Sequence, residues 1–491
     1  MTSHSFRALA VALVAASPSF AQQKTTKSQA LDRRVIPAAS AAPELHVPTW
    51  TKTTLANGAQ LVVSERPGLP LVSFQINFVG GANQYEPADK TGLAGFVSSM
   101  LTEGTTRRTG DQISSDLQLL GTGLSVQIQS ESGRISFLST TDKFAPTLAI
   151  LADVLENPTF PQEALDRLRA RTIVSLTQNR DRTAGIASVV FPKVLYTTAS
   201  PYGRSTSETS VSAITRDDLV SFYKSYFQPG HAIITVTGDV KTADVRRTIE
   251  QALAAWHIGG SMPSFVYPPT AEAKATTIYL VDKPGAAQST FSIGAVGPSR
   301  DTPDYYALRV MNEMLGVLFQ SRLNHNIREV RAYSYGVGSN FSFGRGPGPF
   351  RAGGEIVTAK SDSALIEFMK ELRDIRGPRP PSDDELAQAK ASLVQSLPAS
   401  FASVNGVNGS IASIYTQGLP EDYYQKFAKE VSAVTKEDVV RVAQKYLDPE
   451  KLAIVIVGDR SKIESALAAT KIAPIVILDA NGDPVGKVVQ P

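Results

Sequence analysis

Apolar and polar residues alternate strictly over residues 71–79. The four apolar residues at the even positions from 72 to 78 would share one face, and Ser73, Gln75 and Asn77 would lie on the other. A period of two is typical of a β-strand with one buried face, so we expect a half-buried strand here. Two glycines follow, and an apolar helix is predicted to begin near Thr91.

Similar patterns predict further elements along the first half of the chain. Asn57 and Gly58 lie between two apolar stretches, which indicates a β-hairpin. Strands are expected at 124–129 and 133–139, and helices at 110–120, 145–155, 162–179 and 182–195. Helices and strands do not alternate one by one, which favours an α+β fold over a βαβ fold.

The chain contains an internal repeat. Residues 211–239 align without a gap on residues 431–459, at a constant offset of 220, and 11 of the 29 positions are identical. Thr215 and Thr435 each precede acidic residues, as N-caps of helices do. Such a repeat indicates a duplicated domain.

The repeat divides the chain into two halves. We expect an α+β fold with two duplicated halves, each a mostly antiparallel sheet packed with helices, at residues 50–258 and 276–487. Residues 259–275 are rich in proline and glycine and show no periodicity, which is typical of a linker.

Composition narrows the possible functions. The chain has 491 residues, of which 42% are hydrophobic, enough for two to four packed domains. Its net charge of +3 is too small to indicate binding to nucleic acid or to an anionic membrane surface. It has no cysteine, so disulfides and thiol chemistry are excluded.

The N-terminus predicts export. An apolar run at residues 8–16 is followed by a small-x-small site ending at Ala21, which indicates a signal peptide over residues 1–21. The run is about half as long as a membrane-spanning helix needs, and we expect no membrane span elsewhere. Residues 22–49 predict an extended arm. A bacterial periplasm is the expected location.

The helix after residue 91, which closes with Glu103-Gly104-Thr105, resembles the active helix of the pitrilysin/insulinase-type peptidases. In that family of inverzincins the helix carries H-x-x-E-H, with two histidines that bind zinc and a glutamate that acts as general base. The corresponding residues here are Gly95, Ser98 and Ser99, so no catalytic set is complete. The family's third ligand, a glutamate, would fall within residues 171–180, which contain no acid. The alternative is an ordinary amphipathic helix.

A segment of the second half, which begins at Ser321, is similar to the family pattern S-R-L-x-x-x-(I/L)-R-E-x-x-x-x-x-Y. The resemblance implies that Arg328 and Tyr335 reach the active site from the C-terminal half. An arginine can anchor a substrate carbonyl, and a tyrosine hydroxyl can donate to the oxyanion of the tetrahedral intermediate. The alternative is a surface pair of Arg328 and Glu329 beside an unrelated tyrosine.

The resemblance therefore implies a zinc-less, non-catalytic subunit, as in the mitochondrial processing peptidase and bacterial heterodimeric members of the family. This chain would bind no metal, a homologous partner would carry the zinc, and the substrates would be unfolded peptides. The second hypothesis is an inert pseudopeptidase that acts as a structural or peptide-binding module. Two other chemistries have less support: His325 and Glu329 are more simply a solvated pair, and Ser98 and Ser99 lack a nearby base.

Overall fold

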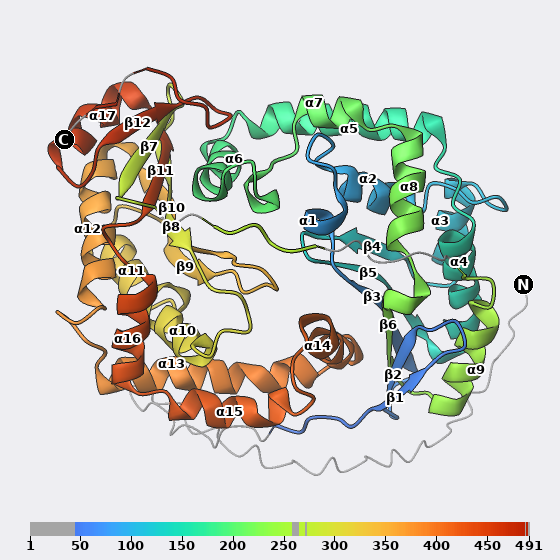
Figure 1. Ribbon diagram of the computed structural model, residues 1–491. Coiled ribbons are helices and arrows are strands. Elements are labelled where there is room, and N and C mark those ends of the chain that lie inside the picture. Colours follow the sequence, from blue (N-terminus) through green and yellow to red (C-terminus); the bar gives the residue numbers. More distant parts are fainter. Residues whose placement is uncertain (1–44, 258–264, 271–272, 487, 490–491) are drawn as a thin grey trace, which may run out of the picture. The chain divides into compact units, whose positions relative to one another are not determined.

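The computed structural model describes residues 45–257, 265–270, 273–486 and 488–489. The predicted signal peptide, most of the predicted arm and part of the predicted linker lie outside the described residues. The described residues belong to one compact unit, in which two six-stranded sheets form (Figure 1). Each sheet is mixed and mostly antiparallel, as expected for an α+β fold of two duplicated halves.

The first sheet is built from the first half of the chain. Its strands are β1 (Thr51–Thr54), β2 (Gln60–Glu65), β3 (Leu71–Val79), β4 (Ser125–Ile128), β5 (Ser132–Thr140) and β6 (Ala232–Gly238). The spatial order is β1-β2-β6-β3-β5-β4, and only β2 and β6 pair in parallel. The predicted hairpin at Asn57-Gly58 is confirmed, because β1 and β2 pair antiparallel on either side of it.

The second sheet repeats this arrangement. Its strands are β7 (Thr277–Asp282), β8 (Gln288–Val296), β9 (Val337–Phe341), β10 (Pro349–Val357), β11 (Ala453–Gly458) and β12 (Ile475–Leu478). The order is β12-β7-β11-β8-β10-β9. Five strands have direct counterparts in the first sheet, but the outermost strand differs: β12 comes from the end of the chain and pairs in parallel with β7, whereas β1 is antiparallel.

The first half of the chain also contributes helices, most of which pack on the apolar face of the first sheet. They are α1 (Ala82–Tyr85), α2 (Leu93–Met100), α3 (Gly110–Leu119), α4 (Phe144–Glu156), α5 (Gln162–Asn179), α6 (Thr183–Tyr196), α7 (Glu208–Ala213), α8 (Arg216–Tyr226) and α9 (Thr242–Ala252). The predicted helices at 110–120, 145–155, 162–179 and 182–195 are confirmed as α3 to α6. The core of this half joins β2, β3 and β6 to α2, α4, α8 and α9.

The second half has corresponding helices around a larger core. They are α10 (Tyr305–Asn312), α11 (Arg322–Asn324), α12 (Ser361–Asp374), α13 (Asp383–Ser396), α14 (Val404–Gln417), α15 (Tyr423–Ala433), α16 (Lys436–Tyr446) and α17 (Arg460–Ala469). Two π-helical segments, Glu313–Val317 and His325–Val330, flank α11. The N-caps predicted from the repeat are confirmed: Thr215 and Thr435 each form a capping box at the start of α8 and α16.

The prediction that β3 is half-buried is wrong, because both of its faces are buried. Ser73, Gln75 and Asn77, on the polar face, are each less than 7% exposed. This face is covered by α14, which belongs to the second half of the chain and packs on β3 and β6 (Figure 1). A period of two identifies the apolar face of a strand, but it does not show whether a distant helix covers the other face.

The reciprocal arrangement holds for the second sheet. Helix α6 comes from the first half and packs on β8 and β11 (Figure 1). Val190 and Phe191 of α6 form an apolar cluster with Val455 and Val457 of β11. One helix from each half therefore packs on the sheet of the other half, and the two halves are held together by these buried contacts.

The end of the predicted arm and the first residue after it, Trp50, also contact the second half. Leu45, Val47 and Trp50 pack against its core, and the indole Nε1 of Trp50 donates a 2.8 Å hydrogen bond to the hydroxyl of Tyr415 on α14. Within the described part of the chain, no helix is long and apolar enough to cross a bilayer.

Candidate functional site

Helix α2 presents the three degenerate motif positions on its outer side. Gly95 and Ser99 are exposed and Ser98 is half-buried, whereas the opposite face packs into the core. A Cβ added at Gly95 would meet no atom within 4 Å, so a larger side chain would fit there. The Ser98 hydroxyl donates to the Ala94 carbonyl at 2.8 Å. The outer side of α2 therefore carries no imidazole or carboxylate at the three positions that the resemblance assigns to the motif.

The start of α2 is fixed by a half-buried carboxylate. Glu86 accepts hydrogen bonds from the backbone N–H of Gly92 at 3.1 Å and of Ala94 at 2.7 Å. Burial raises the pKa of Glu86 above its ordinary value, although these two hydrogen bonds oppose the shift. Negative charge at the N-terminus of a helix is favourable, so Glu86 sets where α2 begins.

Helix α5 carries the region in which the family's third ligand would fall. Residues 171–180 form the C-terminal part of α5 and its first following residue, and α5 packs against α2. Their side chains include no carboxylate or imidazole. Among the residues that the structure describes, no three histidine, cysteine, aspartate or glutamate side chains are grouped so that they could hold a metal ion. The residues at this position do not fit zinc.

Arg328 and Tyr335 occupy different surroundings. The Arg328 Nε lies 3.1 Å from Oε1 of Glu329, and its guanidinium lies 4.6 Å from the ring centroid of Phe319. Tyr335 is 88% exposed, and its hydroxyl has no partner within the described residues. The pair with Glu329 that the sequence left open as an alternative is therefore present. The principal packing partners of α2 are α1, α5, α8 and β4, and none of these elements carries Arg328 or Tyr335.

One residue of the same segment has a structural role that sequence reasoning missed. Arg322 is 5% exposed; its Nε and Nη2 donate to the two carboxylate oxygens of Glu385 at 2.7 and 2.8 Å, and Nη1 donates to the Arg379 carbonyl. Burial alone would raise the pKa of Glu385, but hydrogen bonds from Arg322 and Ser382 outweigh it and hold the pKa at about 2. The arginine of the S-R-L sequence anchors the fold.

The edge strands β4 and β9 of the two sheets differ in how exposed their backbones are. Strand β4 is the outer strand of the first sheet, pairs only with β5 and packs beside α2. Strand β9 is the equivalent edge of the second sheet, but side chains occupy its outer edge: Asn312 donates to the Ser339 carbonyl at 3.1 Å, and the Val337 N–H donates to Asn324 at 3.3 Å. An extended peptide could pair with β4 by adding a strand, whereas β9 is blocked.

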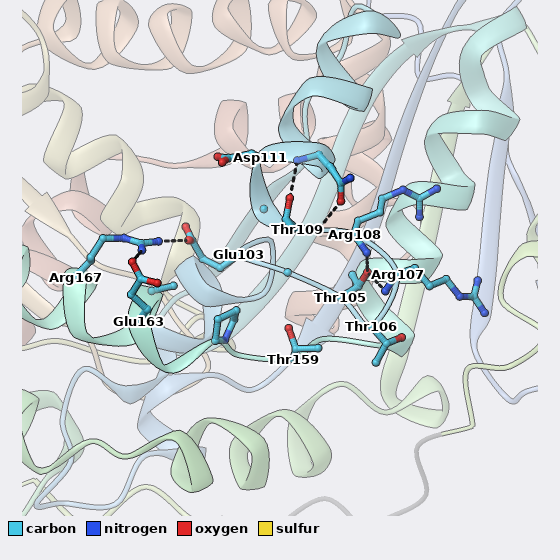
Figure 2. A pocket seen from close by; sticks show the side chains of 15 residues that line it. Glu103, Thr105, Thr106, Arg107, Arg108, Thr109, Asp111, Thr159, Glu163 and Arg167 are labelled. Carbon is cyan, nitrogen blue, oxygen red and sulfur yellow. Dashed lines mark hydrogen bonds and ion pairs between the residues drawn. The ribbon is translucent and has the colours of Figure 1, made fainter.

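The residues that line the hollow at the end of α2 form ion pairs and hydrogen bonds with neighbouring helices. Figure 2 shows Glu103 facing Arg167, which also faces Glu163. The Arg167 guanidinium lies 3.5 Å from the Glu103 carboxylate and 3.0 Å from the Glu163 carboxylate. The Thr105 hydroxyl donates to the buried Asp153 carboxylate at 2.8 Å and accepts from the N–H groups of the two residues after Thr106 in a tight loop. The Glu103-Gly104-Thr105 sequence thus connects α2 to α4 and α5.

Comparison with known families agrees with this architecture. Residues 62–210 match the model of the insulinase family (peptidase family M16), and residues 213–393 match the model described as the peptidase M16 inactive domain. The chain belongs to the M16 (insulinase) peptidase family.

Its relatives include both peptidase subunits and a protein that is not a peptidase. A probable mitochondrial-processing peptidase subunit beta from Arabidopsis thaliana is 23% identical, over 89% of this chain and 85% of the relative. The non-peptidase homolog YmxG from Helicobacter pylori is 22% identical, over 82% of this chain and 92% of the relative.

Solved structures show the same fold. The crystal structure of a peptidase M16 inactive domain from Pseudomonas fluorescens has a TM-score of 0.76 and 27% identity, and it covers 83% of this chain and 98% of that one. A protease from Helicobacter pylori also has a TM-score of 0.76, covering 84% of this chain and 100% of that one, with 18% identity.

Proposed function

We propose that this chain is the zinc-less subunit of an exported, heterodimeric M16 metallopeptidase. A homologous partner would carry H-x-x-E-H and the zinc, and this chain would close the chamber around an unfolded peptide. The observation that carries the proposal is the outer side of α2, where Gly95, Ser98 and Ser99 replace the zinc-binding and general-base residues on an otherwise retained frame.

The residues proposed to act on the substrate are Arg328 and Tyr335. Tyr335 is the better placed of the two, because it is 88% exposed and its hydroxyl could donate to an oxyanion without breaking a contact with another described residue. Arg328 would break its ion pair with Glu329 and then bind a substrate carbonyl. The ring of Phe319 would keep contact with the guanidinium before and after that change.

The location proposed is the periplasm. It rests on the apolar run and small-x-small site in the first 21 residues and on the lack of cysteine in the whole chain. Mature protein recovered from the periplasmic fraction and beginning at residue 22 is the expected result of N-terminal sequencing.

The second candidate function is an inert pseudopeptidase that only binds peptides or supports an assembly. The Arg328–Glu329 pair favours it, because that contact explains Arg328 without any substrate. The likeness to a relative described as a non-peptidase homolog supports this second candidate.

The deciding experiment measures zinc and peptidase activity of this chain alone and after co-expression with an H-x-x-E-H homologue encoded nearby. The proposal expects no zinc and no hydrolysis for the chain alone, and one zinc with activity in a one-to-one complex. Stoichiometric zinc in the isolated chain would overturn the assignment of Gly95, Ser98 and Ser99. A stable complex that remains inactive would favour the pseudopeptidase.

A further inference from the structure

A cavity of about 790 Å³ lies between α6 and the second sheet. One wall is apolar and comes from α6, with Ala187, Phe191 and Pro192. The other wall comes from β8, β9 and β10 and is made of glycine, serine and asparagine residues around Arg351. The volume falls within the range of roughly 300–1,000 Å³ that is typical of ligand pockets.

Arg351 has unused hydrogen-bonding capacity. Its Nε donates to the Ser292 hydroxyl at 2.9 Å, Nη2 makes a long 3.5 Å contact with the Phe291 carbonyl, and Nη1 has no partner within the described residues. The nearest carboxylate on the same face, Glu355, accepts from the Thr290 hydroxyl and forms no ion pair with Arg351. Burial lowers the pKa of Arg351 and the charge of Glu355 opposes that shift, so the guanidinium is charged at neutral pH.

The duplication supplies an internal comparison, because strand register identifies the equivalent position in the first half. Arg351 on β10 pairs with Gly294 on β8 and Asn340 on β9. In the first sheet, Arg134 on β5 pairs in the same way with Asn77 on β3 and Gln127 on β4. Arg134 and Arg351 therefore occupy equivalent positions in the two sheets. Arg134 faces α14, and Arg351 faces α6.

The two equivalent sites are filled differently. In the first half the cavity is only about 170 Å³, and the Gln127 side chain accepts from Arg134 at 3.2 Å. Asn77 occupies the space that corresponds to Gly294, and Asn408 of α14 fills the interface with its hydrogen bonds. In the second half, Gly294 stands in place of Asn77, and a Cβ added there would come within 2.9 Å of the Phe191 ring of α6. Phe191 therefore fills the space beside the glycine, while Arg351 lines the larger cavity next to it.

We propose that the Arg351 cavity binds the carboxylate of a peptide, with an apolar side chain beside that carboxylate packed against Phe191. A guanidinium fork matches a planar carboxylate, and the wall of α6 suits an apolar group within reach of it. The free C-terminus of a short peptide fragment has both features. That the ligand is a peptide rests on the proposed function; the anion site rests on the cavity alone.

The test measures binding to the full chain without any partner, by isothermal titration calorimetry. The probes are N-acetyl-Ala-Phe with a free carboxylate and the same dipeptide as its C-terminal amide. We expect the acid to bind at least tenfold more tightly than the amide. Arg351→Gln should reduce the affinity for the acid to that of the amide, while Arg134→Gln, the matched change in the first half, should leave it unchanged.

A second variant tests the proposal even if the Arg351→Gln protein does not fold. Ser188 is an exposed residue of α6 that lines the cavity, and Ser188→Trp should fill the cavity and weaken binding without touching the arginine. Equal binding of acid and amide, equal loss in both arginine variants, or full displacement by equimolar inorganic phosphate would overturn the proposal. Because no partner or zinc is involved, these results do not depend on whether the heterodimer forms.

Discussion

Asn408 on α14 donates from Nδ2 to both the carbonyl and the hydroxyl oxygen of Ser73 on β3, each at 3.1 Å, although 335 positions separate the two residues. Asn408 also donates to the Thr235 carbonyl at 3.2 Å and is fully buried. This amide therefore holds the second half of the chain on the polar face of the first sheet.

Removing that amide should weaken the whole protein. Asn408→Ala leaves the buried hydroxyls of Ser73 and Thr237 without this partner and opens a small cavity. We expect the free energy of unfolding to fall by roughly 2–4 kcal/mol. The measurement is urea denaturation of the isolated chain.

The matched control is Asn405→Ala, one turn earlier on the same helix, where the side chain is exposed. It should change stability by no more than about 0.5 kcal/mol. Equal effects of the two substitutions would mean that Asn408 does not hold the halves together.

The Arg322–Glu385 pair predicts a pH-dependent stability difference. The folded pKa of Glu385 is about 2, below its ordinary value of 4.5, so its contribution is complete above about pH 5 and is lost as the pH falls toward 2. Glu385→Gln leaves the buried Arg322 without its carboxylate and should destabilise the protein by roughly 2 kcal/mol at pH 7.

That difference should shrink steadily between about pH 4.5 and the lowest pH at which the protein still folds, as measured by urea denaturation across the range. The control is Glu163→Gln, which breaks an exposed pair with Arg167 and should change stability by less than about 0.5 kcal/mol at every pH. A pH-independent difference for Glu385→Gln would contradict the assignment of the low pKa.

Local patterns in the sequence were sufficient to predict the helices and strands, but they did not predict the long-range contacts that hold these elements together. The alternation at 71–79 places β3, and Thr215 and Thr435 mark the starts of α8 and α16. The alternation does not contain the partners of the polar groups on β3. Asn408 and Arg322 act through contacts with residues far along the chain, and no periodicity within a short window encodes such contacts. The candidate site divides likewise: α2 was predictable, but the surroundings of Arg328 were not.

The Glu131 carboxylate should restrain the loop between β9 and β10 and so slow its cleavage by a protease. Its carboxylate accepts from the hydroxyls of Tyr202 and Tyr267 and from the backbone N–H groups of Arg345 and Gly346. Because Glu131→Gln replaces an acceptor oxygen with a donor, the loop should open more often. Trypsin cleavage after Arg345 should become several-fold faster, as followed by mass spectrometry of the native protein.

Glu163→Gln serves again as the control, because it changes an exposed glutamate far along the chain from this loop. Unchanged cleavage after Arg345 in the Glu131→Gln protein would show that the carboxylate does not restrain the loop.

Tyr335→Phe should separate the two functions under consideration. Tyr335 is 88% exposed, so loss of its hydroxyl should leave stability within about 0.5 kcal/mol of the wild type. If the hydroxyl stabilises an oxyanion in the active complex, kcat should fall by roughly 10²-fold with little change in KM. Steady-state kinetics of the co-expressed complex provides the measurement.

Tyr333→Phe is the matched control, two residues earlier, and should leave kcat unchanged. Wild-type kinetics for the Tyr335→Phe complex would remove the hydroxyl from the mechanism and favour a structural role for this subunit.

The outer side of α2 can be tested by restoring histidines. In the double variant Gly95→His, Ser99→His, two imidazoles would stand at i and i+4 on one exposed helix face, where a Cβ at Gly95 has free space. We expect this variant to bind one zinc ion, measured by calorimetry and by metal analysis, whereas each single variant binds none. It should still hydrolyse nothing, because residues 171–180 supply no third ligand and position 98 supplies no base.

Gly95→Ala checks that the position tolerates a side chain: removing a glycine from a helix interior should raise stability by roughly 0.5–1 kcal/mol. Zinc binding no tighter in the double variant than in the single ones would mean that residues 95 and 99 do not share a face, and the likeness of α2 to a zinc helix would fail.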